Sequence, residues 1–249
     1  MASQFRILNP SGGIYMTQLD GLVRDFDRRQ FLRSAASGVV LGAAGQAALE
    51  ITATPRLSAQ SNLSPDAALD QLIAGNQRFA DNRLTSIEHD LSILKGHTVE
   101  KQEPFAGVLS CADSRVPVEL VFDQTIGHIF VTRVAGNIVT PEIVASLEYG
   151  VAVLGIKVLL VLGHSSCGAV KAAMKAESVP GQISSLYLQL YRAVEESGGD
   201  VDKAIEANTK IQAQLLRASS PVIRDAVKGG TLKVESGVYN LATGKVSLS

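Results

Sequence analysis

Two stretches of the sequence decide the fold: Phe105-Ala-Gly-Val-Leu-Ser-Cys111-Ala-Asp113-Ser-Arg115 and Lys157-Val-Leu-Leu-Val-Leu-Gly-His164-Ser-Ser-Cys167-Gly168. In each stretch an apolar run is followed directly by thiol, carboxylate or imidazole side chains. Short apolar runs of this kind predict buried strands. If the two strands are parallel neighbours, their carboxyl ends open onto the same crevice, where open α/β sheets place their chemistry. We therefore expect Cys111, Asp113, His164 and Cys167 to converge there.

These four side chains form the donor set of a tetrahedral Zn²⁺ site. Thiolate sulfur and imidazole nitrogen suit zinc, and a carboxylate oxygen can complete the coordination. Cys111 and Asp113 are two residues apart at a strand end, so their side chains point the same way. His164 and Cys167 are three residues apart, which suits a strand-to-helix turn. A helix N-terminus at Cys167 would also favour the thiolate form of that residue.

The two motifs together resemble the metal motifs of β-class carbonic anhydrases, C-x-D-x-R followed by H-x-x-C-G. Three further segments share the resemblance: Gly75-Asn-Gln-Arg-Phe79, Arg133-Val-Ala-Gly-Asn137 and Gly237-Val-Tyr-Asn-Leu-Ala-Thr-Gly244. The resemblance implies an α/β fold with a mostly parallel central sheet flanked by helices. It also implies one Zn²⁺ per subunit, held by Cys111, His164 and Cys167, with Asp113 as the fourth candidate ligand.

Two catalytic roles follow from this resemblance. Zn²⁺ lowers the pKa of a bound water enough to supply hydroxide at neutral pH, behaviour for which carbonic anhydrases are themselves the reference case. Hydroxide attack on CO₂ would give bicarbonate and a proton. Arg115 can hold the Asp113 carboxylate bidentately, which draws it off the metal and orients it toward the reacting water.

The resemblance also assigns a substrate pocket for CO₂ and bicarbonate. Phe130 and Tyr149 would form an apolar wall, Gln102 would donate an amide hydrogen bond to bicarbonate, and the Gly168 backbone N–H would approach the product. The positions of Gln102 and Tyr149 match the plant-like subgroup. From the residues alone, aromatic core packing is the favoured explanation of Phe130 and Tyr149, and the resemblance reverses that preference. The family further implies a homodimer or higher homo-oligomer with the pocket at the subunit interface.

Several other functions are compatible with parts of this pattern. An enzyme with the same fold and ligands could hydrolyse COS or CS₂, and a non-catalytic relative could bind zinc as a scaffold. A closed structural zinc site would use all four ligands, but such sites rarely place an arginine beside the oxygen ligand. A redox pair of Cys111 and Cys167 would lack C-x-x-C spacing and would leave His164 and Asp113 without a role.

Composition narrows the class of protein. Of the 249 residues, 46% are hydrophobic, enough for a sizeable core, and the formal net charge is −1. That balance argues against nucleic acid as a partner. The chain has two cysteines, which do not make a disulfide framework. We interpret residues 60–249 as one catalytic domain that follows an N-terminal extension over residues 1–59.

The extension carries the twin-arginine pattern of a Tat export signal. Asp27-Arg-Arg-Gln-Phe-Leu-Arg33 precedes an uncharged, Ala- and Gly-rich stretch from Ser34 to Leu49. That stretch is shorter than the roughly 18 to 20 apolar residues of a membrane span, so no stable membrane insertion is expected after cleavage. We expect export to the periplasm or another extracytoplasmic compartment. The alternative is an amphipathic N-terminal helix with an incidental arginine pair.

Strands alternate with helices along the rest of the catalytic domain. The Ser64-Pro65-Asp66 and Thr140-Pro141-Glu142 sequences predict helix starts. A short helix is expected at 117–122, a strand at 129–133 and a helix at 143–154. Residues 182–228 read as helical with a break at Gly198-Gly199, and 231–248 as a hairpin. We interpret His89 and His97 as surface residues, and His128 is a candidate proton shuttle.

Overall fold

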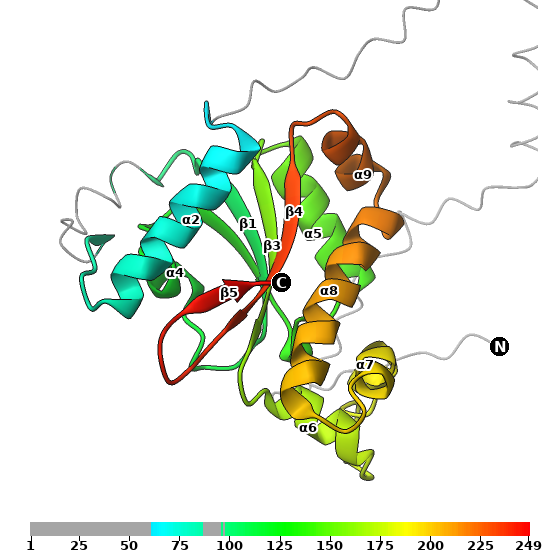
Figure 1. Cartoon of the computed structure of the whole chain (residues 1–249). Coiled ribbons are helices and arrows are strands. Elements are labelled where there is room, and N and C mark those ends of the chain that lie inside the picture. The colour runs from blue at the N-terminus through cyan, green and yellow to red at the C-terminus, as the bar shows by residue number, and fades with distance from the viewer. Residues whose placement is uncertain (1–60, 87–95, 97) are drawn as a thin grey trace, which may run out of the picture. The chain divides into compact units, whose positions relative to one another are not determined.

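The computed structural model describes residues 61–86, 96 and 98–249 (Figure 1). The proposed export segment, His89 and His97 lie outside the described residues. Within the described ranges, no helix combines the length and apolar character needed to cross a lipid bilayer.

A five-stranded sheet forms the centre of the structure. Its strands lie in the order β2-β1-β3-β4-β5, the first four parallel and β5 antiparallel to β4. The bounds are β1 (Ala106–Ser110), β2 (Ile129–Arg133), β3 (Val158–His164), β4 (Lys233–Tyr239) and β5 (Val246–Leu248). This arrangement confirms the predicted mostly parallel sheet and the terminal hairpin.

Helices cover both faces of the sheet (Figure 1). On one face lie α2 (Pro65–Ala80) and α4 (Val118–Val121). On the other lie α5 (Pro141–Ala152), α8 (Val201–Ser219) and α9 (Pro221–Lys228), while α6 (Gly168–Lys175) and α7 (Ser185–Glu196) lie near one end. Successive residues of β1 and β3 alternate between the two hydrophobic clusters, with Val108 and Leu160 facing α2 and Leu109 and Leu159 facing α5 and α8. Burial on both sides explains why these strands are apolar throughout.

Helix starts follow a repeated Ser/Thr-Pro signature. The Ser64 hydroxyl accepts a hydrogen bond from the Ala67 N–H, and Thr140 does the same for Ile143, so both predicted caps are confirmed. A third such cap at Ser220-Pro221 separates α8 from α9. The sequence interpretation placed only one break, at Gly198-Gly199, within 182–228. The additional break has a physical cause, because proline disfavours helical geometry in the residue before it.

The connections between strands make a topological switch point between β1 and β3. From β1 the chain passes to β2 on one side, and from β3 it passes to β4 on the other. Open α/β sheets place their chemistry at the carboxyl ends of strands at such a point. Cys111 follows β1 and His164 ends β3, so both motifs lie at the switch point.

The Gly75–Phe79 segment of α2 attaches this helix to distant parts of the domain. A Cβ at Gly75 would lie 1.9 Å from the Phe122 carbonyl oxygen, so only glycine fits there. The Asn76 amide donates to the carbonyls of Val121 and Gly244 and accepts from the Val246 N–H. The segment therefore ties α4 and the terminal hairpin to one helix.

Asp123 lies beside this junction and its side chain is fully buried. Its carboxylate accepts hydrogen bonds from the Thr85 and Ser86 backbone N–H groups, the Thr85 hydroxyl and the Arg78 guanidinium. Burial by itself would raise the pKa of Asp123, but the N–H of Ser86 and the Arg78 guanidinium outweigh it and hold the pKa below the usual range. The folded protein therefore keeps Asp123 ionised.

We predict that Asp123→Asn lowers the free energy of unfolding at pH 7 by about 2 to 4 kcal/mol, because a buried charge network loses its anion. A group with a depressed folded-state pKa contributes fully above its unfolded pKa of about 4, and its contribution falls as the pH drops below that value. The difference from wild type should therefore stay constant above about pH 5 and shrink progressively as the pH falls below about 4 in urea unfolding curves. Asp81→Asn, at an exposed ion pair with Arg83, is the control and should change stability by less than about 1 kcal/mol. Equal effects of the two substitutions would contradict the prediction.

Candidate metal centre

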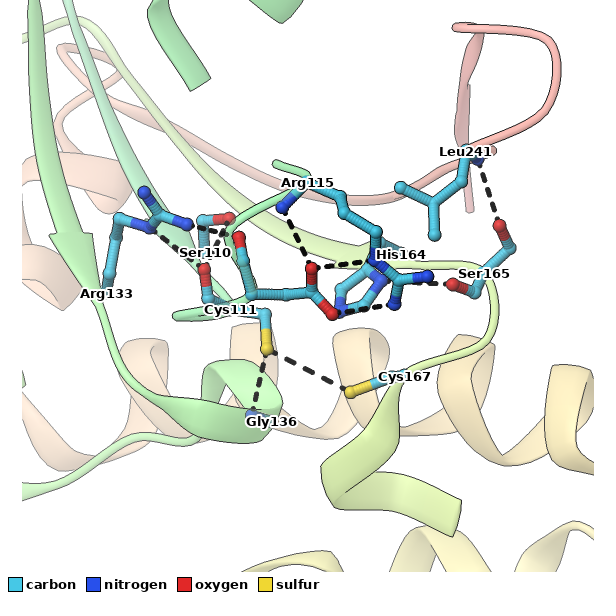
Figure 2. Close-up of polar contacts among 10 residues, drawn as sticks. Ser110, Cys111, Arg115, Arg133, Gly136, His164, Ser165, Cys167 and Leu241 are labelled. Atoms are coloured by element: carbon cyan, nitrogen blue, oxygen red, sulfur yellow. Dashed lines mark hydrogen bonds and ion pairs between the residues drawn. The ribbon is translucent and has the colours of Figure 1, made fainter. Parts of the chain in front are cut away.

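Two buried sulfur atoms meet at the carboxyl end of the sheet (Figure 2). Cys111 directly follows β1, and Cys167 is the N-cap residue of α6. The Cys111 Sγ and Cys167 Sγ atoms are 4.0 Å apart and both cysteines are unbridged. The pairing of Ser110 with Leu162 across β1 and β3 sets this approach, because it places Cys111 beside the last residues of β3.

His164 supplies a nitrogen to the same space. Its side chain is fully buried, and its Nδ1 donates a hydrogen bond of 3.0 Å to the Ser165 carbonyl. Because a carbonyl only accepts, Nδ1 carries the proton and the lone pair is on Nε2. Nε2 is buried and has no hydrogen-bond partner in the described part of the chain. Buried polar atoms are normally paired, so an unpaired imidazole nitrogen indicates a ligand position.

The sulfur and nitrogen atoms of Cys111, His164 and Cys167 all lie within 4.8 Å of one another. This is the spacing of donors around one ion, and two sulfurs with one imidazole suit Zn²⁺. Three protein ligands also leave a fourth position open, as in catalytic zinc sites. The convergence expected from the sequence is therefore present for these three residues.

The pKa values of the two thiols are shifted in opposite directions. The hydrogen bond from the Cys167 thiol and the bond from the Gly136 N–H lower the pKa of Cys111 to about 4, against the effect of its burial. The neighbouring Cys111 raises the pKa of Cys167, as does burial, although the N–H groups of Val170 and Ala169 act in the opposite direction. The predicted effect of the helix N-terminus on Cys167 is thus present but smaller than the repulsion between adjacent thiolates. A divalent cation would remove that repulsion.

Asp113 forms an ion pair with Arg115. Its Oδ1 accepts from the Arg115 backbone N–H at 2.9 Å and from Nε at 3.0 Å, and its Oδ2 accepts from a terminal guanidinium nitrogen at 2.8 Å. Hydrogen bonding to Arg115 holds the pKa of Asp113 well below its usual range. Oδ2 is also 3.7 Å from His164 Nε2. The carboxylate thus borders the cluster of three donors while its main bonds go to the arginine.

Backbone hydrogen bonds fix the loop that carries Cys111 and Asp113. The Arg133 guanidinium donates to the carbonyl oxygens of both residues, and the Gly136 N–H donates to Cys111 Sγ at 3.3 Å. The Ser165 hydroxyl accepts from the Leu241 N–H, which anchors the loop after β3 to the terminal hairpin. Metal ligands commonly depend on such supporting bonds for their orientation.

The residues expected to line a pocket differ in their exposure to solvent within one subunit. The Phe130 and Tyr149 rings, from β2 and α5, are 6.3 Å apart between centroids and tilted by 40°. Tyr149 is 48% exposed, and Gln102 is exposed on the segment before β1. Gly168 begins α6, and a Cβ there would meet no atom within 4 Å. His128 contacts Thr125 Oγ1 through its Nδ1.

Sequence reasoning missed two buried amides, Asn208 and Gln212 of α8. Both contact the loop after β2, which in turn contacts Cys111. A signal was present, since Ala204, Asn208, Gln212 and Leu216 share one helical face at intervals of four and two of them are polar. Amides on an otherwise apolar face require buried partners.

Comparisons with known proteins agree with this geometry. A family model described as carbonic anhydrase matches residues 106–246. Carbonic anhydrase 2 of Mycobacterium tuberculosis is 33% identical over 199 residues, covering 75% of this chain and 94% of the relative. A carbonic anhydrase of Mycolicibacterium smegmatis is 32% identical over 198 residues, with the same coverage of both chains.

The structural similarity points the same way. A Coccomyxa β-carbonic anhydrase, solved with acetazolamide, is similar with a TM-score of 0.57 and 30% identity over 72% of this chain and 85% of that chain. The matched span contains both metal motifs and the four parallel strands that position them. The sequence match and the buried Cys-His-Cys cluster together show that this chain belongs to the carbonic anhydrase family, in its β class.

Proposed function

We propose that this protein catalyses the reversible hydration of CO₂ to bicarbonate and a proton at a Zn²⁺ site formed by Cys111, His164 and Cys167. The observation that carries the proposal is the unpaired, buried Nε2 of His164 facing two sulfurs, with an ionised carboxylate alongside. When bound there, Zn²⁺ supplies Lewis acidity that makes hydroxide available at neutral pH, as the reference carbonic anhydrases do.

In this proposal Asp113 accepts a hydrogen bond from the reacting water and so orients it. Its depressed pKa keeps it ionised, so it accepts hydrogen bonds and does not donate them. Arg115 occupies both carboxylate oxygens from one side, which leaves the remaining lone pair of Oδ2 toward the cluster. A water held there has its own lone pair directed at the carbon of CO₂. The ion pair with Arg115 also keeps Asp113 from acting as a fourth ligand and closing the site.

We predict that Arg115→Ala retains zinc but reduces kcat/KM for CO₂ hydration by about 100-fold or more, because Asp113 is then free to close the fourth position and no longer orients the reacting water. Stopped-flow hydration assays and zinc content should be measured on the same samples. Arg192→Ala, which removes an exposed arginine paired with Glu196, is the matched control and should behave as wild type. Cys111→Ser should instead lose zinc. Wild-type turnover in Arg115→Ala would contradict the role of the pair.

The same proposal assigns the substrate pocket. Phe130 and Tyr149 form the apolar wall, Gln102 donates to bicarbonate, and the Gly168 N–H faces the product, in the manner of the plant-like subgroup. The half-exposed Tyr149 and exposed Gln102 support a pocket completed by a second subunit. So does β2, an edge strand whose Phe130 is only partly buried. We therefore propose a homo-oligomer of at least two chains.

We expect sedimentation velocity of the purified protein to give a mass of a dimer or a multiple of it. Tyr149→Ala should raise KM and weaken association, since the side chain would line the pocket and border the partner. Leu188→Ala, at an exposed apolar residue of α7 that is 82% accessible, serves as the control for loss of surface area. A fully active monomer at assay concentration would refute the shared pocket.

We also propose that the N-terminal extension over residues 1–59 directs export of the protein. Arg28 and Arg29 with the uncharged stretch that follows support export by the Tat route to the periplasm or another extracytoplasmic compartment. This route carries folded proteins, so metal could be loaded before the thiols meet an oxidising environment.

We predict that residues 1–59 fused to a reporter protein direct its export and that the double substitution Arg28→Lys, Arg29→Lys abolishes it. Cell fractionation of a Tat-competent bacterium gives the measurement. The double substitution Arg6→Lys, Arg24→Lys makes the same chemical change outside the motif and should leave export intact. Unchanged export in the first variant would refute the proposed signal.

A further inference from the structure

Two amide side chains are buried on the inner face of α8. Asn208 is 1% exposed and Gln212 is 0% exposed, one helical turn apart. Burying an amide costs free energy unless its donors and acceptors find partners. A leucine at either position would pack against the sheet without that cost, so the partners of these amides indicate what they do.

Two of these partners lie in the loop that follows β2. Gln212 Oε1 accepts from the Val139 N–H at 2.8 Å, and its Nε2 donates to Asn208 Oδ1 at 3.0 Å and to the Gln189 carbonyl at 3.3 Å. Asn208 Nδ2 then donates to the Gly136 carbonyl at 2.8 Å. The two amides thus hold the loop after β2 at Gly136 and at Val139.

The loop has one defined orientation at Gly136. Its φ of +77° is left-handed, and a Cβ there would lie 3.3 Å from a Leu190 methyl group and 3.4 Å from Ala169. Asn137, the next residue, is also left-handed with φ +44°. In this conformation the Gly136 N–H donates to Cys111 Sγ while its carbonyl accepts from Asn208 (Figure 2 shows the sulfur side of this contact). The carbonyl contact with Asn208 helps to hold the glycine in the conformation that places its N–H at the sulfur.

We propose that Asn208 and Gln212 are positioning residues of the metal centre, which hold Gly136 so that its N–H donates to the Cys111 sulfur. This inference rests on the proposed Zn²⁺ site. A hydrogen bond to a ligating thiolate withdraws electron density from the sulfur, which weakens its donation to the metal and leaves the metal more electrophilic. The amides would thereby tune a centre that they do not touch.

A purely structural role would give a different result. If the amides only dock α8 onto the sheet, their loss would lower stability and leave the electronic properties of the sulfur unchanged. Thiolate-to-metal charge transfer separates the two cases, because its energy depends on the hydrogen bonds that the sulfur accepts.

The test uses the full chain loaded with Co²⁺, whose thiolate charge-transfer absorption reports on Cys111 and Cys167. In Asn208→Leu, which is similar in size and cannot donate, we expect this absorption to move to longer wavelength, because the Cys111 sulfur becomes more electron-rich when the Gly136 N–H no longer donates to it. Thr209→Val is the matched control: it removes a buried hydroxyl of the neighbouring residue, whose bond goes to Glu206 within α8. Its spectrum should match wild type.

A second variant covers the case in which Asn208→Leu does not fold. Gln212→Glu keeps the acceptor for Val139 but cannot donate to Asn208, so a smaller shift in the same direction is expected. An unchanged spectrum in whichever variant folds, with normal thiolate absorption in wild type, would overturn this inference alone. Absence of thiolate absorption from Co²⁺-loaded wild type would overturn the proposed metal site and this inference with it.

Discussion

The close approach of two buried sulfur atoms is the constraint on which the rest of the structure depends. Cys111 and Cys167 lie 4.0 Å apart, and thiolates at that distance repel each other in an apolar interior. The parallel register of β1 and β3 brings Cys111 level with the end of β3, and the turn into α6 returns Cys167 to the same point. A divalent cation satisfies both sulfurs and the unpaired nitrogen of His164 at once.

The surroundings hold these donors through the backbone rather than through apolar contact alone. Arg133 donates hydrogen bonds to the carbonyls of Cys111 and Asp113, and the Ser165 carbonyl accepts a hydrogen bond from Nδ1–H of His164. The Ser165 N–H in turn donates to Tyr239, so strand β4 supports the histidine. A site supported on rigid strands can hold donor positions closely, which metal coordination requires.

In the proposed function, the charge of Asp113 distinguishes a reactive site from a structural one. A carboxylate so close to His164 could complete a tetrahedral coordination and exclude water. The bidentate pair with Arg115 supplies a competing partner of fixed geometry, and Arg115 is exposed where Asp113 is half-buried. In the proposed mechanism, the balance between these two partners decides whether the fourth position is available, which would link a surface arginine to chemistry at a buried centre.

The sequence by itself determined the parallel sheet, the principal helices and the donor set. Apolar runs ending in Cys111 and His164 are local signals, because burial on both faces and the residues at a strand end follow from the chain itself. The extra break at Ser220-Pro221 was also readable locally. Only the tertiary structure decided which distant atoms hold these elements together. Asn208 bonds to Gly136, 72 residues away in the sequence, and Asn76 bonds to Gly244, 168 residues away. Such hydrogen bonds depend on how helices pack on the sheet, and side-chain type and spacing along the chain do not encode that packing in any local pattern.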